Sequence, residues 1–209
     1  STYDRVEDQT DLTIGYATGE DATHVKNTIY LPKTGQTGCE VTWSSNTPGV
    51  ISNTGKVQRP GPESNDQTVI LTATIKDPDT LQTVTRQYTV IVLKLTDKEA
   101  TEEAARKMTI QQAATFGTGD IWESLTAQFV LLQTGLYGTT ITWTSNHTDV
   151  ISLADQSGQM TGTVTRQSKD VNVLLTGAFT KGAETTTKSY LVIVKAADVT
   201  KDPSDVRVD

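Results

Sequence analysis

The chain has 209 residues and a net charge of −7, with 35% hydrophobic residues and a single cysteine. Both halves are mildly acidic and neither has a basic patch, which argues against a nucleic-acid partner or an anionic membrane surface. No apolar run approaches the roughly 18 residues of a membrane span, and residues 1–20 lack the pattern of a signal peptide. We therefore expect a soluble piece of a longer, secreted protein.

In chain order, the first half shows several short alternations of apolar and polar residues. Turn residues such as Gly19, Gly35, Pro60 and Asp77-Pro78-Asp79 separate them. Alternation with a period of two indicates half-buried strands. The expected strands are 12–16, 25–31, 39–43, 69–75 and 87–93, with a further short strand near Val57. This pattern predicts a two-sheet β-sandwich.

One stretch occurs twice, 100 residues apart. Residues 40–46 read EVTWSSN and residues 140–146 read TITWTSN, and each is followed by Val-Ile-Ser. The repeat predicts two domains, residues 1–95 and 96–209. The second copy carries a small insertion at 154–157. The residues expected in the two cores are Val41, Trp43, Leu71 and Tyr88, with Ile141, Trp143, Leu175 and Tyr190 as their counterparts.

Residues 94–108 differ in kind from the strands. Thr96 followed by Glu99 matches a capping box, and acidic residues precede basic ones at a spacing of four. The segment predicts a helix of about three turns that connects the domains. A helical connector is stiffer than a Gly/Ser linker, so we expect a restricted, lengthwise arrangement of the domains.

The order of motifs resembles a known bacterial family. A strand ends in LPKTG at 31–35, then come TWSSN at 42–46, VIS at 50–52, GKV at 55–57, Arg59-Pro60 and LTAT at 71–74. This resembles the atrophied bacterial Ig-like domain, a relative of the group 2 bacterial Ig-like domains of adhesins. The second copy departs from it at Leu132 and at 163–166. The resemblance implies extracellular modules that occur in tandem in glycoside hydrolases, polysaccharide lyases and adhesins, without catalytic residues.

Several motifs have a structural and a functional interpretation. LPKTG is a sortase signal, but here it leads into a core strand. Cys39 lacks an obvious base and fits a small buried hydrophobe better than a nucleophile. Acidic pairs at Glu20-Asp21, Asp77/Asp79 and Asp120/Glu123 fit solvated turns, with weak calcium binding as the alternative. No other metal or cofactor is expected.

Trp122 is the best candidate contact residue. It has no aromatic counterpart in the first copy and lies in an expected turn beside Asp120 and Glu123. An exposed Trp there would suit a carbohydrate or a protein ligand. Trp43 and Trp143, by contrast, occupy the strand whose Trp is core in Ig sandwiches.

Two hypotheses follow. The first is a non-catalytic spacer or interaction module of a secreted or cell-surface bacterial protein, monomeric and joined to adjacent domains. The second is a carbohydrate-binding accessory module of a glycoside hydrolase or polysaccharide lyase. Candidate partners are glycans and host or cell-surface proteins. Enzyme activity is not expected, because no catalytic constellation is present.

Overall fold

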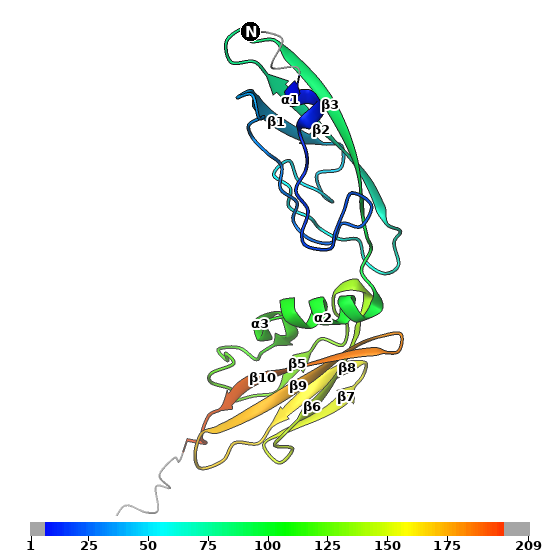
Figure 1. Ribbon diagram of the computed structural model, residues 1–209. Coiled ribbons are helices and arrows are strands. Elements are labelled where there is room, and N and C mark those ends of the chain that lie inside the picture. The colour runs from blue at the N-terminus through cyan, green and yellow to red at the C-terminus, as the bar shows by residue number, and fades with distance from the viewer. Residues whose placement is uncertain (1–6, 199–209) are drawn as a thin grey trace, which may run out of the picture. The chain divides into compact units, whose positions relative to one another are not determined.

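The computed structural model describes residues 7–198, which divide into two compact units at Thr96/Asp97 (Figure 1). We call the first unit domain 1 and the second domain 2. Antiparallel strands dominate both units. The all-β class that the alternating sequence predicted is therefore confirmed.

Domain 1 contains one regular sheet. Its three antiparallel strands lie in the order β1 (Glu40–Ser45), β2 (Gln67–Lys76) and β3 (Thr83–Val92). The central strand is rich in β-branched residues, which pack well on a pleated surface. Facing this sheet, the chain forms isolated bridges only, such as Gly15 with Tyr30 and Ile51 with Val57.

The expected strands at 12–16 and 25–31 are thus wrong as regular strands. Their inward residues are nevertheless buried: Leu12, Ile14, Val25, Ile29 and Leu31. Alternation places side chains correctly, but a ladder also needs a partner strand of matching length. The short bridge at Ile51 and Val57 does not supply one.

Domain 2 contains two regular sheets. One has the order β10-β9-β6 and the other β4-β5-β8-β7. A single 3-10 turn, η1 (Leu136–Gly138), precedes β6. The strands are β4 (Ala114–Thr115), β5 (Phe129–Leu131), β6 (Thr140–Ser145), β7 (Ile151–Gln156), β8 (Gln159–Val164), β9 (Val171–Lys181) and β10 (Glu184–Val194).

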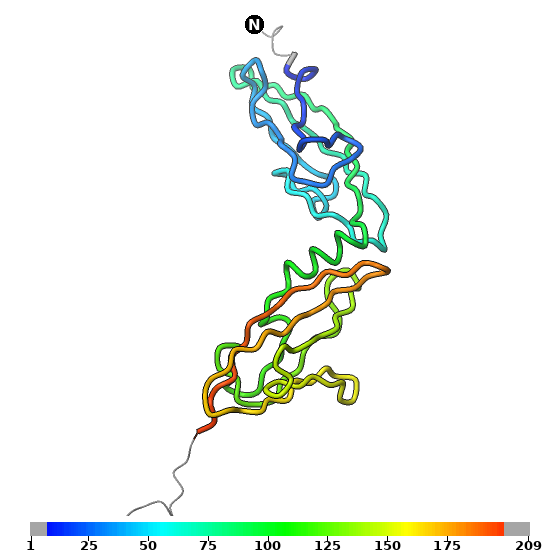
Figure 2. The backbone as a smooth tube through the Cα atoms, turned by 60° about the horizontal axis from the view of Figure 1, so that its bottom comes forward, coloured from blue at the N-terminus to red at the C-terminus, as the bar shows by residue number. Residues whose placement is uncertain are grey.

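The inserted residues of the second copy lengthen one hairpin. Strands β7 and β8 pair from Ile151↔Val164 to Gln156↔Gln159, with Ser157 and Gly158 at the tip (Figure 2, yellow). Both tip residues have positive φ, 54° and 83°, as a type I′ hairpin turn requires. Domain 1 has only the Ile51↔Val57 bridge at this place.

The helix expected between the domains is α2 (Asp97–Lys107), and it packs on the β10-β9 face of domain 2 (Figure 1). Its buried residues are small, namely Ala100, Thr101, Ala104 and Ala105, so the helix lies close to the sheet. The Thr101 and Thr186 hydroxyls are 2.8 Å apart across this contact. A second helix, α3 (Ile110–Ala113), begins with a capping box at Thr109.

Domain 1 begins with a shorter helix, α1 (Glu7–Asp11). In both domains a Tyr of the last strand donates a hydrogen bond to the residue that follows a helix. Tyr88 donates to the carbonyl of Leu12, after α1, and Tyr190 donates to the carbonyl of Met108, after α2. The two acceptors, Leu12 and Met108, are 96 residues apart in the sequence, whereas the repeated stretches 40–46 and 140–146 are 100 residues apart. The four residues of α3 account for the difference.

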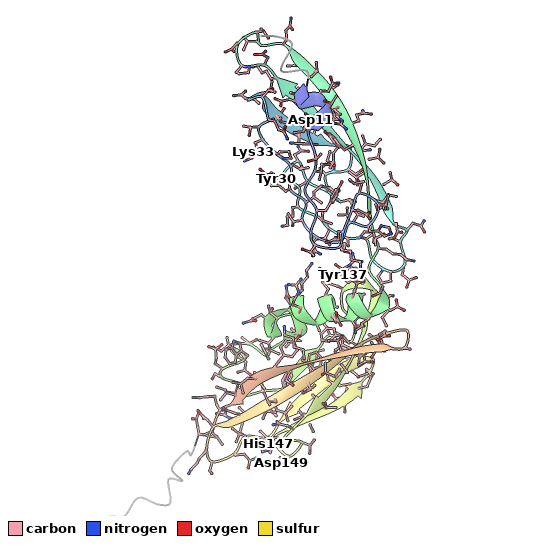
Figure 3. The ribbon with its side chains drawn as sticks, viewed as in Figure 1. Asp11, Tyr30, Lys33, Tyr137, His147 and Asp149 are labelled. Atoms are coloured by element: carbon pink, nitrogen blue, oxygen red, sulfur yellow. The ribbon has the colours of Figure 1, made fainter. Side chains whose placement is uncertain are left out.

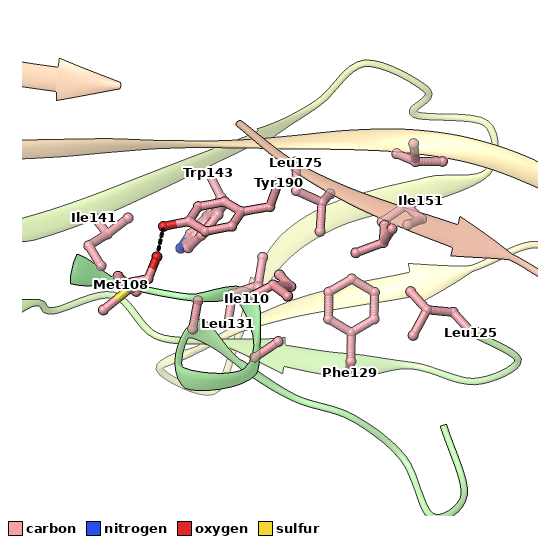
Figure 4. Close-up of a cluster of buried hydrophobic side chains, with 14 of the residues drawn as sticks. Met108, Ile110, Leu125, Phe129, Leu131, Ile141, Trp143, Ile151, Leu175 and Tyr190 are labelled. Carbon is pink, nitrogen blue, oxygen red and sulfur yellow. Dashed lines mark hydrogen bonds between the residues drawn. The ribbon is translucent and has the colours of Figure 1, made fainter. Parts of the chain in front are cut away.

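The core of domain 2 is one continuous cluster (Figure 4). The rings of Trp143 and Tyr190 lie 5.6 Å apart and the Tyr190 hydroxyl is 2.8 Å from the Met108 carbonyl. In domain 1 the core forms two smaller clusters, and Trp43 and Tyr88 pack against both. The Trp and Tyr therefore link the two ends of the domain 1 core.

Candidate functional site

Asp120 stabilises its own loop. Its carboxylate accepts hydrogen bonds from the N–H groups of Thr126 and Ala127, at 2.9 and 3.0 Å, and from the Thr126 hydroxyl at 2.8 Å. Burial acts to raise the pKa of Asp120, but these bonds outweigh it and the pKa lies below its usual value. Glu20 accepts the corresponding N–H bonds from Lys26 and Asn27 in domain 1.

Trp122 is half-buried and packs against the core of domain 2. Its backbone carbonyl accepts a hydrogen bond from the N–H of Ile193, at 2.8 Å. The ring lines a pocket of about 350 Å³, together with Ile110, Gln111, Ser189, Tyr190 and Leu191. Glu123 is exposed and does not line this pocket. The structure therefore does not gather Asp120, Trp122 and Glu123 into one site.

The eight expected core residues divide into two groups. Six are buried: Val41, Leu71, Ile141, Trp143, Leu175 and Tyr190. Trp43 and Tyr88 are half-buried. Trp43 and Trp143 nevertheless make equivalent hydrogen bonds, because each indole Nε1 donates to a backbone carbonyl. The acceptors are Pro32, at 2.8 Å, and Leu132, at 2.7 Å. The LPKTG motif is thus part of the packing around Trp43.

In both domains a basic side chain bonds backbone carbonyls at the C-terminal end of a helix, α1 in domain 1 and α2 in domain 2. Arg86 donates to the carbonyls of Gln9 and Thr10, and Lys188 donates to those of Arg106 and Met108. A positive charge at the C-terminal end of a helix stabilises it by interaction with the helix dipole. Sequence reasoning missed this pair, because Arg86 and Lys188 are merely basic residues on an alternating strand.

An arginine also clamps the chain after each last strand. The Arg59 guanidinium donates to the carbonyls of Leu93 and Lys94, both at 2.8 Å. Arg166 bonds those of Lys195 and Ala196 in the same way, at 3.1 and 2.5 Å. Arg166 thus takes the role of Arg59, although the sequence around it departs from the Arg-Pro pattern.

The turn asparagine is another repeated backbone partner. Asn46 accepts from the N–H of Ile70 and Asn146 from that of Leu174, at 2.9 and 2.8 Å. Asn146, His147 and Thr148 also match the Asn-X-Thr pattern of N-glycosylation, and Figure 3 shows His147 beside Asp149. The amide of Asn146 is therefore already engaged with the fold.

Asp21, Thr23 and His24 form the group that most resembles a catalytic triad. One oxygen of Asp21 receives all three bonds, from the Thr23 N–H and hydroxyl, both at 2.8 Å, and from His24 Nδ1 at 3.0 Å. The His24 bond and the Thr23 bonds lower the pKa of Asp21 to about 2. The group is exposed and occupies one tight turn, so it acts as a turn cap.

Cys39 is buried in domain 1 beside a buried carboxylate, Asp8. Asp8 accepts from the Thr37 N–H at 2.7 Å, from its hydroxyl at 2.5 Å and from the Cys39 N–H at 3.3 Å. Burial acts to raise the pKa of Asp8, but these bonds hold it below its usual value. The carboxylate thus fastens α1 to the turn that leads into β1.

Domain 1 has a groove of about 800 Å³ on its surface. Its lining includes the segment 28–31, residues 40–43 of the edge strand β1, and Asn53 and Thr54. Two aromatic residues line it, Tyr30 and the half-buried Trp43. Figure 3 shows Tyr30 and Lys33 projecting from the same edge of the domain.

Residues 7–198 contain no group of three or more His, Cys, Asp or Glu side chains placed to hold a metal ion. The helices in the same range are too short and too polar for any of them to cross a membrane.

Two successive β units, each with an indole packed on a Tyr of its last strand, define a pair of Ig-like modules. A family model described as the atrophied bacterial Ig domain matches residues 6–95 and again residues 101–197. The chain belongs to this family, as the order of its motifs predicted.

Comparison with known proteins adds little on function. No curated protein matches the sequence. A SusE-like surface located polysaccharide binding protein from the Bacteroides thetaiotaomicron heparin utilisation locus is 14% identical, with a TM-score of 0.29 over 90% of this chain. This chain spans only 34% of that protein. Chicken VE-cadherin EC1-2 is 13% identical, with a TM-score of 0.26 over 84% of this chain and 97% of its own. At these TM-scores, neither match bears on what this chain binds.

Proposed function

We propose that this chain is a non-catalytic Ig-like module of a secreted or cell-surface bacterial protein, such as an adhesin or a multidomain glycan-degrading enzyme. It acts as a monomer that is joined to adjacent domains of the same polypeptide. The observation that carries the proposal is the use of the repeated polar residues. The arginine clamps, the helix-end cations, the turn asparagines and the loop carboxylates all bond backbone groups of their own domain.

Residues engaged in this way are poor candidates for chemistry on a substrate. A catalytic acid, base or nucleophile must reach the substrate and change its protonation state or its bonds. The Asp21 group comes nearest, and its single shared oxygen holds Thr23 and His24 in a turn.

Three measurements test this proposal. The purified chain should release no reducing ends from neutral or anionic polysaccharides, and sedimentation equilibrium should give the monomer mass of 22.6 kDa. Antibodies against the chain should label intact cells of the source bacterium without permeabilisation. Hydrolysis that disappears when Asp21 is changed to Asn, or labelling only after permeabilisation, would overturn it.

The second candidate function is carbohydrate binding at Trp122. The supporting observation is the pocket of about 350 Å³ that its half-buried ring forms with Tyr190 and Leu191. The four-residue helix α3 supplies Ile110 and Gln111 to this pocket, and domain 1 has no corresponding insertion. Retention on a polysaccharide gel that is lost in Trp122→Ala supports this function. Retention that is unchanged in this variant contradicts it.

A further inference from the structure

We propose that the groove of domain 1 binds a neutral saccharide chain, with Tyr30 as its main contact. This site is separate from the Trp122 pocket and does not depend on the non-catalytic role proposed above. The argument rests on the exposed aromatic ring, the polar residues around it, the occupied strand edge and the contrast with domain 2.

Tyr30 is unusually exposed for a large aromatic residue. Its relative exposure is 68%, the highest among the large hydrophobic residues of the described chain. Its neighbours Ile29 and Leu31 are buried, and its backbone pairs with Gly15, so the residue is firmly placed. An exposed aromatic ring held by fixed backbone offers a flat apolar face at little cost in entropy.

The groove combines apolar faces with hydrogen-bonding groups. Its inner surface includes Ile29, Leu31 and Val41, and Trp43 forms a second aromatic wall whose indole N–H is fixed on Pro32. Exposed threonine hydroxyls, the Asn53 amide and two charged groups surround these faces. A sugar has this same combination, with apolar C–H faces and hydroxyls at its edges. The volume of about 800 Å³ lies within the range of ligand pockets, roughly 300–1,000 Å³.

The charges in the groove favour a neutral chain. Lys33 and Glu40 contribute one positive and one negative side chain. A uronate or sulfate polymer would meet one attractive and one repulsive group, in a chain that is already negative overall. Neutral hydroxyls can donate to Glu40 and accept from Lys33, so both charged groups can contribute.

An extended peptide fits the groove less well. A peptide that adds to an edge strand needs a row of free backbone groups. On β1, the N–H of Val41 already donates to the carbonyl of Lys33, at 2.8 Å, and the N–H of Ser45 to Asn53 Oδ1, also at 2.8 Å. The edge is therefore largely occupied by the domain itself.

Domain 2 shows the same place in a closed form. Val130 and Gln133 stand where Tyr30 and Lys33 stand in domain 1. The long β7–β8 hairpin pairs with β5, and Asp155 on β7 lies 3.4 Å from the Gln133 amide. Trp143 is only 7% exposed. Val130 and Gln133 are therefore natural replacements for Tyr30 and Lys33 that this fold accepts.

Affinity electrophoresis of the full chain tests the proposal. The gels contain xylan, glucomannan or mixed-linkage β-glucan, with polygalacturonate, heparin and immobilised unfolded casein for comparison. We expect retardation by at least one neutral polysaccharide. The double variant Tyr30→Val, Lys33→Gln should weaken binding about tenfold, which corresponds to about 1.4 kcal/mol, because truncation of a main aromatic contact commonly costs this much.

Matched controls separate binding from folding and from the second site. The double variant should keep the melting temperature of the wild type, because both side chains are exposed and both replacements occur in domain 2. Trp122→Ala should keep the retardation. The proposal is overturned if no neutral polysaccharide retards the chain, if only casein or an anionic polymer binds, or if the double variant is retarded as strongly as the wild type.

Discussion

Replacing Gly162 by alanine tests the packing that closes the second domain. Gly162 on β8 pairs with Phe129 on β5, and a Cβ atom at position 162 would lie 2.4, 2.6 and 2.8 Å from three ring carbons of Phe129. Ordinary carbon contacts need about 3.5 Å or more, so the ring would have to move by about 1 Å. Phe129 is only 2% exposed and belongs to the core cluster of domain 2, and closely packed cores resist such shifts.

The expected cost follows from these contacts. Overpacking of a core costs about 1–3 kcal/mol. The loss of glycine freedom in the unfolded chain returns about 0.4–1 kcal/mol. We expect a net loss of about 1.3 kcal/mol, which lowers the melting temperature of a domain of this size by roughly 5–10 °C. Domain 1 should be unaffected.

Scanning calorimetry of the full chain measures this change as a shift of the domain 2 transition. Gly117→Ala is the matched control, because its nearest neighbours are at 3.5 Å and its φ is not positive. That variant should be neutral or slightly stabilising. Phe129→Leu should reduce the cost of Gly162→Ala in a double-mutant cycle. An unchanged domain 2 transition in Gly162→Ala, or equal losses at positions 162 and 117, would refute the reasoning.

Three further changes test polar side chains that hydrogen-bond within their own domain. Asp8→Asn should cost domain 1 about 1–2 kcal/mol at pH 7. Because the pKa of Asp8 is lowered from 3.8 in the folded state, this difference should shrink as pH falls below that value; urea unfolding with equal acid dependence in both proteins would contradict it. Tyr190→Phe should cost domain 2 about 1 kcal/mol, since Lys188 still bonds the Met108 carbonyl. Burial raises the pKa of Tyr190 to about 12, so its stabilisation is complete below pH 10 and declines toward pH 12; the same alkaline decline in the Phe variant would argue against this origin. Asp120→Asn should lower domain 2 stability by about 1 kcal/mol and leave any polysaccharide retardation intact, and lost retardation would instead make Asp120 a ligand contact.

The strands that could be predicted are those with a partner of comparable length. β2 and β9 were visible because a long alternation pairs with a second long alternation, as in the register Gln67↔Val92. The segments 12–16 and 25–31 alternate equally well, and their inward residues are buried. Their hydrogen-bond partners are set by the distant segment 51–57, whose length a local pattern does not report.

The candidate site was harder to predict, because the role of a polar side chain depends on donors elsewhere in the fold. Asp120 looks like a free turn acid, and only the folded loop brings the N–H groups of Thr126 and Ala127 onto it. Tyr30 had a usable signal, since it stands between two inward residues and must therefore face outward. The depth of the groove beside Tyr30 depends on the short 51–57 turn, which the alternation does not encode.

The difference in hairpin length has a consequence for valency. Domain 1 has a single bridge beside its groove, whereas Asp155 on the β7–β8 hairpin of domain 2 lies 3.4 Å from Gln133, the counterpart of Lys33. Of these two modules of one ancestry, the first therefore carries the open groove. A polypeptide that repeated this pair would gain one such groove for every two modules. Its avidity for a long polymer would then rise with the number of pairs, and with the spacing that the closed module maintains between open ones.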